Sequence, residues 1–211
     1  SKEALGSFLE RFAVDVPPAW SVLAVTFTNK AANEMKTRLS ALVGEAAKDI
    51  WCGTFHSMCL RILRTHATKL GFSSSFTIYD TDDQKKLMSE CIKQLGIDEK
   101  SIPPKTALSY ISRAKGKLTD IHGFDAEAGM DYRLQQISSL YTLYQGRLAE
   151  ANAMDFDDII MFTVKLLREN PDVLEYYRGK FQYVLVDEFQ DTNPAQFELT
   201  RLIGGGYNNI M

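Results

Sequence analysis

The segments that look like β-strands lie at the two ends of this chain, and that separation constrains its fold more than any other feature. Two short apolar runs rich in β-branched and aromatic residues occur near the start, at 22–27 and 50–55. The next clear strand signal, at 183–186, comes after a long stretch dominated by helical periodicity. Because parallel strands need neighbours, we expect both ends to share one sheet, with the middle inserted as a mostly α-helical subdomain.

Helix signals fill the space between these strands. Apolar residues from Ala31 to Leu42 recur at helical spacing, and Gly44 follows as a stop signal. A short helical pattern also occurs at Phe8, Leu9 and Phe12. We therefore expect an α/β fold divided into three parts: an α/β segment at 1–57, a helical insertion at 58–180, and a return to the α/β layer at 181–211.

Composition excludes several classes of protein. The chain has 211 residues and a net charge of −3, so no uniformly basic surface exists to hold duplex DNA by charge alone. Cys52, Cys59 and Cys91 form no CxxC pair, which argues against zinc ribbons and redox dithiols and suits a reducing cytosol. No apolar run approaches the roughly 20 residues of a membrane helix, and residues at the N-terminus of this sequence do not form the apolar h-region of a signal peptide. We expect a cytoplasmic protein with no membrane segment.

Two adjacent carboxylates, Asp187 and Glu188, directly follow the last strand in the run YVLVDEFQDTN. Open parallel sheets bind ligands beyond the carboxyl ends of their strands, and Mg²⁺ takes only one or two carboxylates. One acid could therefore hold a metal ion while the other orients or deprotonates a water molecule. Acids at strand ends are also common as turn residues or helix caps. The unbroken polar cluster from Gln190 to Asn193 favours the catalytic explanation.

Three stretches resemble motifs of superfamily 1 DNA helicases of the UvrD/Rep/PcrA family, in the same order. DEFQDTN resembles their Walker B motif, AVTFTNKAANEM resembles motif Ia, and GTFHSMCLRILR resembles the following segment, which also touches single-stranded DNA. MDFDDII resembles a stretch shortly before the Walker B motif. The resemblance implies part of a RecA-like P-loop NTPase domain, in an ATP-driven motor that moves 3′ to 5′ on single-stranded DNA and unwinds duplex.

The resemblance also implies roles for individual residues. Asp187 would bind Mg²⁺, Glu188 would contact the metal and activate water, and Gln190 would couple the nucleotide state to neighbouring motifs. Single-stranded DNA, or its junction with duplex, would contact residues that follow the first two strands: Phe27, Thr28, Asn29, Lys30, Thr54, Phe55 and His56. An aromatic ring at a strand tip can stack on a base, and helix N-termini attract phosphates. Helix capping, core packing or simple solvation remain the ordinary alternatives for each.

One family feature is missing from the sequence. No GxxxxGK[ST] phosphate loop occurs, so no residue is assigned to the phosphates of ATP. Two carboxylates repel phosphate and cannot replace a loop of backbone N–H groups with a lysine. In the family this loop lies just before motif Ia. We therefore expect the chain to be a piece of a larger helicase, with ATP and Mg²⁺ as cofactors of the whole protein and negligible ATPase activity by itself.

Three other interpretations stay open. A helicase–nuclease of the RecB or AddA type shares these motifs, and a non-catalytic scaffold paralogue would explain the missing phosphate loop. A nuclease or calcium site at Asp155, Asp157 and Asp158 is the third, but their spacing lacks the glycine and glutamate of an EF-hand. Capping of a helix accounts for Asp155. The sequence leaves open the oligomeric state and the choice between repair, replication and plasmid roles.

Overall fold

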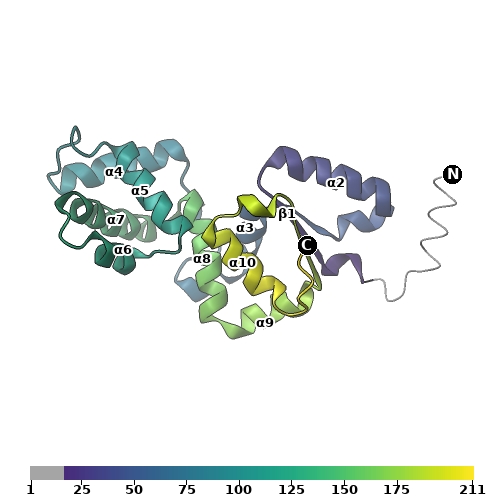
Figure 1. Ribbon diagram of the computed structural model, residues 1–211. Coiled ribbons are helices and arrows are strands. Elements are labelled where there is room, and N and C mark those ends of the chain that lie inside the picture. The colour runs from purple at the N-terminus through teal and green to yellow at the C-terminus, as the bar shows by residue number, and fades with distance from the viewer. Residues whose placement is uncertain (1–16) are drawn as a thin grey trace.

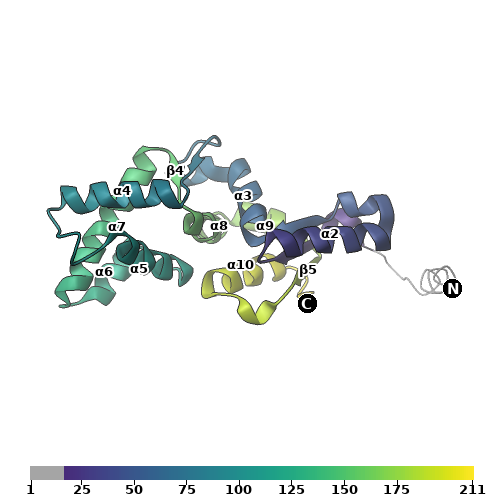
Figure 2. The same cartoon turned by 90° about the horizontal axis from the view of Figure 1, so that it is seen from above.

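The computed structural model describes residues 17–211 of the chain. The helical pattern expected at Phe8, Leu9 and Phe12 lies outside the described residues. Figures 1 and 2 show two lobes side by side, one made of helices α4 to α7 and the other built around a small sheet, with α8 lying between them. We call these the helical lobe and the sheet lobe. No helix within 17–211 is both long and apolar enough to span a bilayer.

The secondary structure alternates at both ends of the described chain and is helical in the middle. The strands are β1 (Val22–Thr26), β2 (Trp51–Thr54), β3 (Thr77–Ile78), β4 (Ala153–Met154) and β5 (Tyr183–Val186). The α-helices are α2 (Asn29–Val43), α3 (Phe55–His66), α4 (Thr81–Gln94), α5 (Pro104–Gly116), α6 (Ile121–Ala128), α7 (Tyr132–Glu150), α8 (Phe156–Glu169), α9 (Pro171–Lys180) and α10 (Pro194–Gly204). Short 3₁₀ helices are η1 (Ala19–Ser21), η2 (Gly44–Lys48), η3 (Ala67–Leu70) and η4 (Phe189–Asp191).

The two ends of the chain share one parallel sheet, as the sequence predicted. Its strand order is β2-β1-β5, and β1 pairs with both neighbours in parallel. The backbone at 209–211 continues the sheet beside β5, because Met211 N donates to Val184 O at 3.0 Å and Val186 N donates to Met211 O at 2.8 Å. The central position of β1 follows from its composition, since Leu23, Ala24 and Val25 are each at most 2% exposed.

Buried side chains form two clusters that divide the chain more finely than its sequence suggests. One cluster joins the three-stranded sheet to residues of α3, α8, α9 and α10, including Cys59, Leu167 and Val184. The other holds the helical lobe together around Met88, Ile111 and other side chains of α4 to α7. The predicted insertion, 58–180, is therefore larger than the separately packed helical lobe. The reason is that α3, α8 and α9 bury their apolar faces against the sheet.

Side-chain caps explain where several helices begin. Thr28 accepts a hydrogen bond from Ala31 N at the start of α2, and Asp80 caps α4 in a reciprocal arrangement with Asp83. The same reciprocal arrangement joins Asn193 and Gln196 at the start of α10. Thr, Asp and Asn are residue types that favour the N-cap position of a helix. The Thr28 and Asn193 caps begin the helices that follow β1 and β5, and the segments between each strand and its helix belong to the candidate site.

Candidate functional site

Asp187 is held at the carboxyl end of β5 by two contacts with the neighbouring strand. Its backbone N–H donates to Val25 O at 3.0 Å, so the ladder between β5 and β1 continues through this residue. The buried hydroxyl of Thr26 donates to Asp187 Oδ2 at 3.1 Å. Asp187 itself is exposed. Its carboxylate is therefore oriented by the protein on one side and open to solvent on the other.

Glu188 has an unusual backbone conformation. Its φ of 53° and ψ of 46° lie in the left-handed region, where a residue with a side chain is strained by roughly 1–3 kcal/mol. The Gln190 side-chain amide donates to the Glu188 carboxylate, and Asp191 N donates to Glu188 O at 2.9 Å. The strained conformation is thus held by the short η4 turn. It turns an acid outward at the sheet edge, where ligands of parallel sheets bind.

The pair fits Mg²⁺ but not a cage made entirely of protein ligands. Within residues 17–211, no three side chains among His, Cys, Asp and Glu are grouped so as to hold a metal ion. Mg²⁺ normally keeps several waters and takes one or two carboxylates together with substrate phosphates. One carboxylate oxygen of Asp187 accepts a hydrogen bond from Thr26, and both Asp187 and Glu188 are exposed to solvent. The two acids therefore provide the oxygen donors that such an ion needs.

The segments that follow β1 and β2 meet at the same edge. Thr26 and Thr54 are paired in register, so the residues after them leave the sheet side by side. Thr54 caps α3 by accepting from Ser57 N at 3.2 Å, just as Thr28 caps α2. Asn29 and Lys30 are exposed in the first turn of α2. Both helix N-termini and the two acids therefore lie along one edge of the sheet.

The aromatic residues of this set differ in what they offer a ligand. Phe27 is half-buried, and its ring is 5.4 Å from that of Phe55, measured between centroids. Phe55 is only 1% exposed, so it supports Phe27 from the core and has no free face for a base. This burial corrects the expectation that Phe55 lines a ligand path. The sequence suggested a strand-end residue, but α3 begins at Phe55 and turns it inward.

His56 is half-buried and stacks on Phe156 of α8, with centroids 4.0 Å apart and an interplanar angle of 29°. Burial lowers the pKa of His56 from 6.5 to about 4. The ring is therefore neutral at neutral pH and offers hydrogen bonds rather than positive charge. Sequence reasoning did not identify Phe156 as its partner, because the two residues lie on different elements that only the fold brings together.

Asp155 and Asp158 surround a buried lysine, which occupies the place where a metal ion would have to bind. Lys115 Nζ lies 2.6 Å from Asp155 Oδ2 and 2.8 Å from Asp158 Oδ1, and all three side chains are at most 3% exposed. Burial alone would lower the pKa of Lys115, but the two carboxylates outweigh it and raise the pKa above its ordinary value. Asp155 also caps α8, as expected. No three His, Cys, Asp or Glu side chains within residues 17–211, Asp157 included, are grouped so as to hold a metal ion, so the calcium or nuclease interpretation is wrong.

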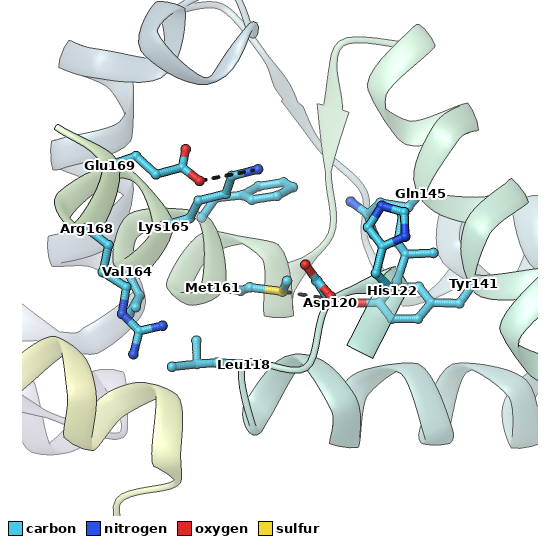
Figure 3. Close-up of a pocket in the computed structure, with 12 residues that line it drawn as sticks. Leu118, Asp120, His122, Tyr141, Gln145, Met161, Val164, Lys165, Arg168 and Glu169 are labelled. Carbon is cyan, nitrogen blue, oxygen red and sulfur yellow. Dashed lines mark hydrogen bonds and ion pairs between the residues drawn. The ribbon is translucent and has the colours of Figure 1, made fainter. Parts of the chain in front are cut away.

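A separate cavity of about 430 Å³ lies between the helical lobe and α8. Figure 3 shows Tyr141, Gln145 and His122 on one side of it, and Lys165, Arg168 and other residues of α8 on the other. The Tyr141 hydroxyl donates to Thr119 O at 3.3 Å. None of the residues predicted for the candidate site lines this cavity. We therefore treat the edge of the three-stranded sheet, and not the cavity, as the candidate site.

The fold and this edge together define part of a RecA-like α/β domain. The family described as "UvrD/REP helicase N-terminal domain" matches residues 12–211, and the chain belongs to this family. It is 46% identical over 196 residues to the ATP-dependent DNA helicase PcrA of Staphylococcus aureus strain Mu50, covering 93% of this chain. PcrA of Staphylococcus epidermidis strain RP62A is 45% identical over the same length. The chain spans only 27% of the length of these relatives.

Proposed function

We propose that this chain works as part of an ATP-dependent DNA helicase, a motor that moves 3′ to 5′ on single-stranded DNA and unwinds duplex at junctions. The observation that carries the proposal is the shared edge. Two oriented acids follow β5, and exposed polar residues at two helix N-termini follow β1 and β2 beside them. Membership of the UvrD/REP family and the similarity to PcrA support the same function.

In the proposed mechanism, Asp187 and Glu188 would hold Mg²⁺, and Glu188 acts on the attacking water. Mg²⁺, when bound with ATP, would neutralise charge on the phosphate oxygens. Thr26 keeps one Asp187 oxygen occupied and so fixes the direction of the other. Glu188 orients or deprotonates the attacking water, and Gln190 restrains its carboxylate. These residues supply no cradle for the triphosphate itself, since the sequence has no phosphate loop.

The DNA-contacting roles fall to residues after β1 and β2. Phe27 presents a half-exposed ring that can stack on a base, and Lys30 is an exposed cation without an ion pair among the described residues. Thr28 and Thr54 use their hydroxyls as helix caps, so they contribute mainly by fixing the N-termini of α2 and α3. Asn29 and His56 can donate hydrogen bonds to single-stranded DNA. Stacking and phosphate contacts of this kind do not depend on sequence.

We further propose that the parent protein acts in the cytoplasm in DNA repair or replication. The 1–57 and 181–211 segments belong to its motor domain, and the residues between them carry the inserted subdomain. The helical lobe is the part of that insertion that packs independently of the sheet. The isolated 211-residue chain is expected to hydrolyse ATP negligibly, because it lacks a phosphate loop.

The decisive experiment is a Glu188→Gln substitution in the full-length protein. ATP hydrolysis stimulated by single-stranded DNA should fall by about 10²- to 10⁴-fold, the usual contribution of a general base, while nucleotide binding persists. In parallel, Phe27→Ala should weaken binding of single-stranded DNA by about 1–3 kcal/mol. Tyr176→Ala is the matched control, because Tyr176 is 58% exposed and belongs to α9, which precedes β5. Turnover at the wild-type rate in the Glu188 variant would refute the proposed mechanism.

A further inference from the structure

The helical lobe touches the Walker B loop, residues 187–193, through the last residue of α5. A Cβ atom placed on Gly116 would lie 3.5 Å from Nδ2 of Asn193 and 4.0 Å from its Cγ. The backbone of Gly116 is therefore packed directly beside the Asn193 side chain. The contact joins two segments that are far apart in the sequence. It lies where the helical lobe meets α10, which Figure 1 shows close to the end of α5.

The Walker B loop is anchored at two positions, and Asn193 is one of them. Its Oδ1 accepts from Gln196 N at 2.9 Å, and its own N–H donates to Gln196 Oε1 at 2.9 Å, so it caps α10. At the other end, Asp187 is tied to Val25 and Thr26 of β1. Glu188, in its strained conformation, lies between these two ends. A displacement of Asn193 would therefore change the position of Glu188.

The position of Gly116 is itself fixed by the residue before it. Lys115 binds two carboxylates at the start of α8, those of its N-cap Asp155 and of Asp158, in a fully buried site. Tyr144 of α7 donates to Asp155 Oδ2 at 3.2 Å, and Gln145 donates to both oxygens of Asp158 at 3.1 Å. This network joins α5, α7 and α8. The end of α5 is therefore a defined support for Asn193 rather than a loose surface.

We propose that Gly116 is a positioning residue for ATP hydrolysis: it sets the place of Asn193, and through the Walker B loop the place of Glu188. The position of the helical lobe then affects the rate of hydrolysis. This inference rests on the proposed function. A Cβ atom fits at an ordinary contact distance from Asn193, so we expect only a side chain larger than a methyl group to displace it. No special backbone conformation is required, because Gly116 lies within α5 and is not among the described glycines with positive φ.

The test is a size series at position 116 in the full-length protein. Gly116→Ala adds one carbon at an ordinary contact distance and should keep DNA-stimulated kcat within about twofold. Gly116→Val adds two methyl groups to a Cβ that already lies 3.5 Å from Asn193, and one χ1 rotamer dominates for valine in a helix, so the side chain has little freedom to avoid Asn193. It should lower kcat by roughly 10- to 100-fold with little change in KM for ATP, as expected when a catalytic group is misplaced. Gly146→Val is the matched control, because Gly146 lies within α7 and has nothing within 4 Å of its Cβ position.

A second-site variant separates positioning from general damage. Asn193→Ser shortens the side chain but keeps a good N-cap for α10. In the Gly116→Val background it should restore most of the lost kcat, which a merely unfolded protein would not allow. Unchanged kcat in Gly116→Val, an equal loss in Gly146→Val, or no recovery in the double variant would overturn the inference. If the wild-type protein itself shows no DNA-stimulated hydrolysis, the proposed function fails instead.

Discussion

Replacing Lys115 by methionine removes one cation and leaves two carboxylates facing each other in a dry site. Asp155 and Asp158 are 3% and 0% exposed at their side chains, and the lysine is fully buried between them. Breaking a buried pair by removing one partner typically costs about 3–5 kcal/mol, because the remaining charge is uncompensated. Here the loss should lie in that range at pH 7. The remaining donors, Tyr144 and Gln145, are neutral and replace only part of the lysine's contribution.

The pH dependence of this loss follows from Asp158. Burial raises the pKa of Asp158 from 3.8 to about 6, with Lys115 acting in the opposite direction. A carboxyl whose pKa is higher in the folded protein favours folding when it is protonated, and this contribution disappears as the pH rises through the folded-state pKa. Without Lys115 the pKa of Asp158 should rise further. The Lys115→Met variant should therefore lose less stability at pH 5 than at pH 7.

Urea unfolding of the 211-residue chain, followed by circular dichroism, measures this effect. With a slope of about 2 kcal/mol per molar urea, a loss of 4 kcal/mol lowers the midpoint by about 2 M. The control is Lys115→Met combined with Asp158→Asn, which removes one of the two uncompensated charges and should recover part of the loss. A midpoint within about 0.3 M of wild type at pH 7, or a larger loss at pH 5, would refute the reasoning.

Three further predictions concern the sheet edge. Glu188→Gly should raise the free energy of unfolding by up to about 1 kcal/mol, because glycine adopts positive φ without strain, and a lower urea midpoint would contradict this. The pKa of His56 is lowered from 6.5 to about 4 in the folded protein, so folding favours the neutral ring. The stability that His56 contributes is therefore complete above pH 6.5 and is lost as the pH falls towards 4. The loss is about 3 kcal/mol at most, and His56→Phe should remove this part of the pH dependence. Thr26→Val should raise the Mg²⁺ concentration for half-maximal ATP hydrolysis about tenfold in the full-length protein, and Thr26→Ser should not.

Local signals in the sequence predicted those parts of the fold that depend on neighbouring residues. The start of α4 at Thr81 follows from its Asp80 cap, and the start of α10 follows from Asn193 and the proline after it. The shared sheet followed from a physical need, because neither end of the chain has enough strands by itself. The two acids were placed correctly at a strand end, since an apolar run of four residues ends at Val186.

Contacts between distant residues were beyond what such signals could show. Lys115 and Asp155 are 40 positions apart, and nothing in the local pattern distinguishes this buried lysine from a solvated one. Short helices such as α6 and α9 carry too few turns for a clear apolar period. Phe55 was misplaced because one residue decides whether it ends a strand or begins a helix, and the Thr54 cap makes it the latter. In each case the three-dimensional partner decides the role.

The strained Glu188 and the buried Lys115 break local preferences for connected reasons. A residue in the left-handed region persists only where its surroundings hold it there, and here the Walker B loop is fixed at Asp187 by β1 and at Asn193 by α10. Asn193 in turn lies beside Gly116, and the hydrogen-bonded network around Lys115 fixes the position of Gly116. If the network served stability alone, well-packed apolar side chains of similar size would do as well or better. A network that instead fixes the end of α5 beside Asn193, at one end of the loop that carries the strained Glu188, is better explained by the proposed role of that loop than by the demands of the core.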